Sequence, residues 1–180
     1  MKFLIKFYLY LVRFFRSANP TSINITIPPS NIGGEELIIR GIVKPLFYRS
    51  SKNRLDEKAF LPPPTRMDVS VLRHDFTSSN FCKYHIKEKV LIKDNEYCGL
   101  AVIRAISIDY VNSKENCILE NGERITVEIK STPLDNLNFH SDILYSHSAI
   151  SGEPNTLMRK IAKSLIEKSR YLHDPNPLEK

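Results

Sequence analysis

Two stretches of the sequence hold side chains whose types and spacing could bind or transform an anionic group. Ser70, Arg73 and His74 lie within one short segment, and a guanidinium group binds a phosphate or carboxylate through two parallel hydrogen bonds. A serine nucleophile needs a base within hydrogen-bond reach, and His147 is the histidine that we select for that role. The hypothesis is a pocket with Ser70 and His147 as catalytic residues and four substrate-binding arginines: Arg40, Arg49, Arg54 and Arg73.

His147 is selected because of its neighbours. Serines flank it on both sides and Gly152 follows, just before a predicted helix, and the free N–H groups of a helix N-terminus can receive an anion. His140 and Asp142 lie nearby, and imidazole with carboxylate suits a metal ion or acid–base chemistry. The sequence holds no H-E-x-x-H or comparable spacing, so we predict no metal site and no cofactor.

The same residues also have a purely structural interpretation. Isolated histidines such as His140 and His147 are commonly hydrogen-bonded loop or core residues. Ser70 would then face solvent on its strand, and Arg73 would be an ion-pair partner. The pocket hypothesis instead requires the long loop at residues 44–67 to fold back over the sheet, so that Arg49 or Arg54 approaches Ser70 and Arg73, with His147 entering from the segment before the final helix.

Hydrophobic patterning predicts the strands that would position these residues. Residues 37–43 form an apolar, β-rich run that contains Arg40 and Gly41, a pair that could also meet a ligand where the backbone approaches closely. Residues 68–73 alternate, with Val69 and Val71 pointing inward. The β pattern continues over residues 90–92 and 99–111. Asn121-Gly122 then predicts a type I′ hairpin between residues 117–120 and 123–127.

Two helices are predicted in the same region of the chain. Ser78 or Ser79 can cap a short helix, and Asn155 or Thr156 can cap a longer one near the end. We therefore predict a single α+β domain over residues 37–172 with one antiparallel or mixed sheet. Residues 20–36 would be a linker with a possible edge strand, and residues 173–180 a C-terminal tail. The apolar face of the final helix comprises Leu157, Ile161, Ala162, Leu165 and Ile166.

Composition and charge narrow the classes of protein. The chain has 180 residues, 42% of them hydrophobic and 26% charged, which is typical of a globular domain. Its three cysteines form no C-x-x-C pair and are predicted to be core residues in a reducing, cytoplasmic compartment. The formal net charge is +6. Residues 1–34 carry four basic and no acidic residues, while the rest carries 22 basic and 20 acidic residues, so nucleic acid is the weaker alternative as a partner.

The first nineteen residues are predicted to form a basic amphipathic helix. At 100° per residue, the four basic residues fall within an arc of about 80°. The uncharged run at residues 7–12 is too short to span a bilayer. Secretory and transit peptides are alternatives, as is packing of the apolar face on the protein's own body. The favoured interpretation is an interfacial helix that contacts a partner protein or an anionic membrane at the inner face through Lys2, Lys6, Phe7, Leu11, Arg13, Phe14 and Arg16.

Short motifs carry a resemblance over residues 37–172. They are Arg49-Ser50-Ser51 leading to Ala59-Phe60, then Val69-Ser70-Val71 with Arg73, and finally Ser146-His147-Ser148-Ala149-Ile150 with Gly152. This pattern resembles a loosely defined group of small bacterial proteins without an established activity. The chain departs from the group in having Leu144-Tyr145-Ser146 where those proteins have Asn-Pro-Ala before the histidine. The resemblance implies a shared fold and no particular chemistry.

Three functional hypotheses result from the sequence. The first is a non-enzymatic interaction or regulatory module, attached through its N-terminal helix to a membrane surface or a partner protein. The second is a small hydrolase or transferase that acts on an anionic, phosphate-containing substrate. The third is a nucleic-acid-associated protein. A structure that gathers Arg40, Ser70, Arg73 and His147 in one pocket would support the second hypothesis.

Overall fold

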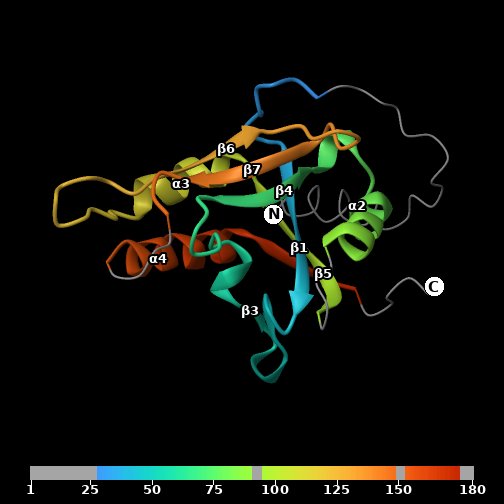
Figure 1. Cartoon of the computed structure of the whole chain (residues 1–180), viewed down its shortest axis with the longest axis horizontal. Coiled ribbons are helices and arrows are strands. Elements are labelled where there is room, and N and C mark those ends of the chain that lie inside the picture. Colours follow the sequence, from blue (N-terminus) through green and yellow to red (C-terminus); the bar gives the residue numbers. More distant parts are fainter. Residues whose placement is uncertain (1–27, 91–94, 149–152, 175–180) are drawn as a thin grey trace, which may run out of the picture.

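The computed structural model describes residues 28–90, 95–148 and 153–174 (Figure 1). The helix predicted over residues 1–19 and the first part of the predicted linker, residues 20–27, lie outside the described residues. The strands are β1 (Leu37–Lys44), β2 (Tyr48–Arg49), β3 (Arg54–Leu55), β4 (Asp68–Arg73), β5 (Glu96–Arg104), β6 (Val127–Ser131), β7 (His140–Tyr145) and β8 (Arg170–His173). The α-helices are α2 (Ser79–His85), α3 (Ile106–Lys114) and α4 (Glu153–Lys168), and a π-helical turn at Ile86–Val90 extends α2.

Six of the strands form one antiparallel sheet in the order β6-β7-β4-β1-β5-β8. The short strands β2 and β3 form a separate hairpin. The predicted α+β class with an antiparallel sheet is therefore confirmed. Among the described residues, no helix is long and apolar enough to cross a bilayer.

Helices cover both faces of the sheet, as Figure 1 shows. Alternation along β1 sends Ile38 to the face that packs against α3 and α4, and Ile39 to the face that packs against α2. Val69 and Val71 of β4 are each 2% exposed, which confirms the prediction that they point inward. The predicted apolar stripe of α4 is buried over Leu157, Ile161, Ala162 and Leu165, and Ile166 packs at its margin.

The predicted short helix begins where its capping residue stands. Ser78 is the N-cap of α2, and its Oγ accepts a hydrogen bond from the Phe81 amide at 3.1 Å. A serine in this position satisfies one of the amide groups that the first turn leaves without a partner. The cap fixes where α2 starts and therefore which of its residues face the sheet.

Several predicted elements are wrong in detail. Residues 106–111 form part of α3 and not a strand, because Ile108 and Val111, three apart, are the buried pair. Of Asn121 and Gly122, only the glycine has a positive φ, at +85°. The turn is therefore not type I′, and the Leu119 carbonyl accepts from the Gly122 amide at 2.9 Å. The final helix starts at Glu153, ahead of both predicted caps.

The segment that was predicted as one long loop, residues 44–67, contains structure of its own. It holds the β2–β3 hairpin and a 3₁₀ turn at Glu57–Ala59. Tyr48 and Phe60 are buried, and the Tyr145 hydroxyl donates to the Phe60 carbonyl at 2.7 Å. These contacts fix the segment against the body of the protein.

Candidate functional site

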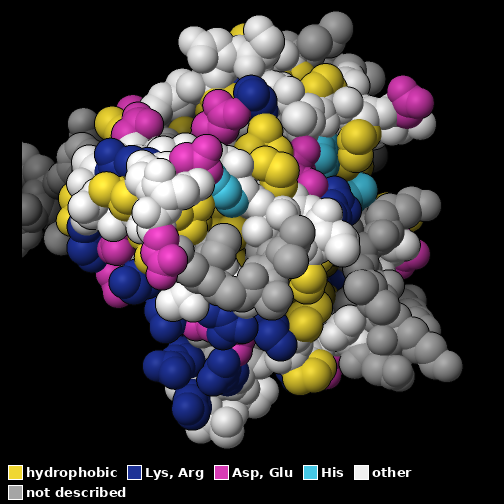
Figure 2. Space-filling view, turned by 60° about the vertical axis from the view of Figure 1, so that its left-hand side comes forward, with side chains coloured by type: hydrophobic (Ala, Val, Ile, Leu, Met, Phe, Trp, Pro, Cys, Tyr) yellow, Lys and Arg dark blue, Asp and Glu magenta, His cyan; other side chains and the backbone are white. Residues whose placement is uncertain are grey.

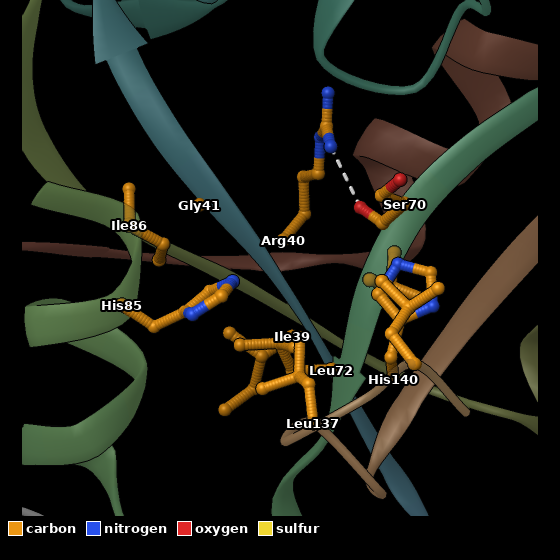
Figure 3. A pocket seen from close by; sticks show the side chains of 11 residues that line it. Ile39, Arg40, Gly41, Ser70, Leu72, His85, Ile86, Leu137 and His140 are labelled. Atoms are coloured by element: carbon orange, nitrogen blue, oxygen red, sulfur yellow. Dashed lines mark hydrogen bonds between the residues drawn. The ribbon is translucent and has the colours of Figure 1, made fainter. Parts of the chain in front are cut away.

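The two central strands of the sheet separate, and Arg40 spans the opening. β1 pairs with β4 only at Ile38–Arg73 and Ile39–Leu72, after which β1 continues beside β5 and β4 beside β7. The Arg40 guanidinium crosses from β1 and donates from Nη1 to the Ser70 carbonyl at 2.6 Å, as Figure 3 shows. Its Nε donates to the Ala59 carbonyl at 3.1 Å. Arg40 thus contacts Ser70 at its backbone carbonyl and not at the hydroxyl that the pocket hypothesis assigns as nucleophile.

The hydrogen bonds of the Arg40 guanidinium go to neutral groups. The Ser70 and Ala59 carbonyls accept its hydrogen bonds, and the guanidinium lies 4.9 Å from the centre of the Phe47 ring. In the part of the chain that the structure describes, no carboxylate forms an ion pair with it. Burial lowers the pKa of Arg40 to about 10. The nearby carboxylates of Asp142 and Asp68 act in the opposite direction and compensate part of the guanidinium charge.

A cavity of about 470 Å³ opens beside Arg40 on the face that carries α2. Ile39, Leu72 and Leu137 form an apolar floor between two imidazoles, His85 from α2 and His140 from β7 (Figure 3). Arg40 directs its guanidinium away from this floor. We call this space the histidine cavity; its remaining lining residues are Arg40, Gly41, Ser70, Val71, Ile86 and Leu134.

Hydrogen bonds determine the orientation of His140. Its Nδ1 lies 2.8 Å from the Thr132 carbonyl, which can only accept, so Nδ1 carries a proton. The Thr132 hydroxyl donates to Oδ2 of Asp142 at 2.7 Å. The other carboxylate oxygen, Oδ1, is buried without a hydrogen bond and lies 3.8 Å from Nε2 of His140. Among the described residues, no group of three potential ligands could hold a metal ion.

Gly41 allows the helix to pack closely on the sheet. A Cβ atom at this position would lie 2.6 Å from Cδ1 of Ile86. The absence of a side chain on β1 therefore lets the end of α2 and its π-helical turn sit close to the sheet. The sequence predicted a close approach at Arg40-Gly41, and the group that approaches is Ile86.

A second cavity of about 530 Å³ lies next to Arg40. Its walls are mainly apolar and come from the end of β1 and from the segment that links β3 to β4. We call it the apolar groove. It is lined by Val43, Leu46, Phe47, Leu61, Pro62, Pro63 and Pro64, by the amides Asn95 and Asn155, and by the cations Arg40, Lys58 and Arg159.

Arg73 lines neither cavity. Its side chain has no exposed surface, and Nη2 donates to Oε2 of Glu36 at 2.8 Å while Nε donates to Oε1 at 2.5 Å. The Pro29 and Asn31 carbonyls accept further hydrogen bonds from its two terminal nitrogens. The guanidinium also lies 4.7 Å from the centre of the Phe76 ring. These contacts match the ion-pair alternative for Arg73, and the structure does not bring it together with Arg40 and Ser70 in one cavity.

His147 also lines neither cavity. Its Nε2 lies 3.3 Å from Oε2 of Glu123, and its Nδ1 lies 2.9 Å from the Ser146 hydroxyl. Hydrogen bonds from Asn121 and His147 lower the pKa of the exposed Glu123 carboxyl below its usual value. The structure thus places His147 beside Glu123, outside the two cavities. The catalytic role assigned to His147 stays a prediction.

Arg49 and Arg54 occupy an exposed surface on the β2–β3 hairpin. They face each other directly across the two strands, although like charges at such positions destabilise a hairpin. Arg49 forms an ion pair with Asp56. Burial opposes ionisation of that carboxyl, but hydrogen bonds from the Lys58 amide and from Arg49 hold its pKa below the usual value.

The hairpin belongs to a larger concentration of positive charge. Glu57 pairs with Arg159 at 2.5 Å and with Lys163 at 3.6 Å, so the hairpin segment and α4 lie side by side. Figure 2 shows Lys and Arg side chains gathered on one part of this face. We call this region the basic surface; its members are Arg49, Lys52, Arg54, Lys58, Arg159 and Lys163, all exposed, around the two acidic residues Asp56 and Glu57.

The cysteines contribute packing. Cys82, Cys98 and Cys117 are buried and unpaired, as the sequence predicted. Burial raises the pKa of the Cys82 thiol to about 12, and it also raises the pKa values of the other two thiols. A thiolate is the nucleophilic form of cysteine, so these residues are poorly suited to catalysis.

Sequence reasoning missed the residues that complete the two cavities. His85 is the last residue of α2, and it lines the same cavity as His140 because α2 packs on that face of the sheet. Lys58 and Arg159 reach the apolar groove from segments about 100 residues apart. The one local signal was the aromatic and proline content of residues 44–67, which does not show that the segment lines a groove. Comparisons with protein families, with curated proteins and with solved structures give no match for this chain.

Proposed function

We propose that the protein is a non-enzymatic interaction module that docks on an anionic membrane surface. The observation that carries the proposal is the basic surface, in which six exposed cations surround two carboxylates. Each Lys or Arg held near an anionic bilayer contributes about 1 kcal/mol of attraction. The local excess of four positive charges thus corresponds to about 4 kcal/mol.

The sequence supports a membrane as the anionic partner. The opening run combines Lys2, Lys6, Arg13 and Arg16 with inserted aromatic and aliphatic residues, a composition typical of interfacial segments. Stable attachment of a protein to a bilayer generally takes two signals. An apolar run and a separate basic surface supply two such signals of different physical kinds.

The enzymatic hypothesis has less support. Arg40 and Ser70 share the histidine cavity, but Arg73 and His147 lie elsewhere. The cavity wall is largely apolar, and the guanidinium of Arg40 binds backbone carbonyls. A hydrolase or transferase would have to use His85 or His140 in place of His147.

Neutralising part of the basic surface should weaken binding to acidic vesicles. In the full-length protein, the double substitution Lys52→Gln and Arg54→Gln removes two charges, so the partition coefficient should fall about thirtyfold, the equivalent of about 2 kcal/mol. The measurement is co-sedimentation with vesicles of phosphatidylcholine and phosphatidylglycerol at low salt. Raising the salt concentration should weaken binding of the native protein, because exposed charges are screened.

The matched control is the double substitution Lys114→Gln and Lys130→Gln, which removes two exposed lysines outside the basic surface. It should leave the partition coefficient within about twofold of native. Phe7→Asp with Leu11→Asp tests the apolar signal separately. Equal binding to pure phosphatidylcholine vesicles, or tighter binding to single-stranded RNA than to acidic vesicles, would reject the membrane proposal.

A further inference from the structure

We propose that the apolar groove binds one single-chain lipid with an anionic head. The apolar chain would lie against Leu46, Phe47 and Leu61, and the head would lie at Lys58 and Arg159. The inference rests on the proposed function for the source of the lipid, which is the membrane. The groove's capacity to bind a free amphipathic anion is measured separately below.

The walls of the apolar groove combine partly exposed apolar surface with a rigid proline backbone. Leu46, Phe47 and Leu61 are each only partly buried, so a bound chain would remove further apolar area from water at about 25 cal/mol per Å². Three consecutive prolines, Pro62, Pro63 and Pro64, form one side, and each has a restricted backbone. The Arg40 guanidinium stacks on the Phe47 ring and holds it in place. A volume of about 530 Å³ is in the range of sites that bind small molecules.

The charge of the lining residues selects the head group. Arg40, Lys58 and Arg159 line the groove together with two amides, and none of its lining residues is acidic. Arg159 shares its charge with Glu57, whereas no carboxylate in the described segments pairs with Lys58. An apolar chain with an ammonium head would meet repulsion. The protein's own opening run, which carries four basic residues and no acidic one, is disfavoured as an occupant for the same reason.

The position of the groove connects it to the basic surface. Lys58 and Arg159 belong to both. A lipid head attracted to the basic surface would therefore have its chain beside an apolar cavity. The basic surface would attract many lipid head groups of the membrane at once. The apolar groove would bind one lipid molecule.

Calorimetric titration of the full-length protein with decanoate, below its micellar concentration, tests the inference. We expect one decanoate to bind per chain. Decanol, which lacks the charge, should bind at least tenfold more weakly, and neither decyltrimethylammonium nor inorganic phosphate should bind measurably. Equal binding of decanoate and decyltrimethylammonium would show that charge plays no part, and equal binding of phosphate would show that the chain plays none.

Two charge-reversal variants separate the groove from the basic surface. Lys58→Glu should weaken decanoate binding at least tenfold, because Lys58 lines the groove. Lys52→Glu should leave it unchanged, because Lys52 belongs to the basic surface and does not line the groove. Both substitutions should weaken binding to acidic vesicles to a similar extent.

Leu46→Trp fills the groove and should abolish decanoate binding without reducing vesicle binding. Circular dichroism and thermal unfolding check that each variant is folded. Decanoate binding that survives both Lys58→Glu and Leu46→Trp would overturn the inference, as would its absence from the native protein. Loss of vesicle binding alone would overturn the proposed function and leave the decanoate result standing.

Discussion

Replacing Arg73 with methionine should lower the free energy of unfolding by about 3–5 kcal/mol, the cost of leaving one member of a buried ion pair without its partner. Glu36 is 8% exposed and Arg73 is 0% exposed, so water cannot replace the lost guanidinium. The backbone carbonyls of Pro29 and Asn31 would lose their donors as well. Urea denaturation followed by circular dichroism measures the effect.

The double variant Arg73→Met with Glu36→Gln is the informative control. Removing both charges should recover a substantial part of the loss, because the remaining groups carry no net charge to bury. A native-like free energy of unfolding in Arg73→Met would contradict the buried ion pair. It would also return Arg73 to the list of residues available for binding an anion, which is the role that the sequence suggested.

Replacing Gly99 with alanine should cost about 3 kcal/mol, the upper end of the usual penalty for an overpacked site. A Cβ atom there would lie 2.3 Å from the Leu172 carbonyl oxygen, which belongs to the backbone of β8 and cannot rotate away. Strand β8 would have to move off β5, where Gly99 pairs with His173. The hydrogen bond from the Tyr171 hydroxyl to the Cys98 carbonyl, 2.8 Å long, would be disturbed too.

Hydrogen exchange distinguishes this mechanism from a general loss of stability. In Gly99→Ala, the amides of β8 should exchange faster than those of β4 and β7. Gly33→Ala is the matched control, since a Cβ atom at Gly33 would meet nothing within 4 Å, and its stability should stay within about 0.5 kcal/mol of native. Uniform loss of protection across the sheet in Gly99→Ala would argue against local displacement of β8.

The sequence predicted well the elements whose hydrophobic pattern fits only one type of secondary structure. Alternation around Val69 and Val71 identifies β4, and the apolar stripe from Leu157 to Leu165 identifies α4. Ile106 and Ile108 have the spacing of one strand face, but Ile106 is exposed, and the buried residues Ile108 and Val111 have the spacing of a helix face. Strand β8 has four residues, too few for a periodic signal, and its place depends on the bare backbone at Gly99.

The candidate sites depend on contacts that no local pattern carries. The pairing of Arg40 with the Ser70 carbonyl follows from where β1 leaves β4, and spacing along the chain does not encode that point. Arg73 was grouped with Ser70 because the two lie three residues apart. On a strand, that odd spacing sends them to opposite faces, and Arg73 meets Glu36 instead.

The separation of β1 from β4 makes Arg40 a link between the two halves of the sheet. The sheet consists of two three-stranded groups, β6-β7-β4 and β1-β5-β8. The two groups pair with each other at Ile38–Arg73 and Ile39–Leu72. Farther along the two strands, the hydrogen bond from Arg40 to the Ser70 carbonyl links β1 to β4 again. Because Arg40 lines both the histidine cavity and the apolar groove, a shift of its side chain would change the shape of both cavities.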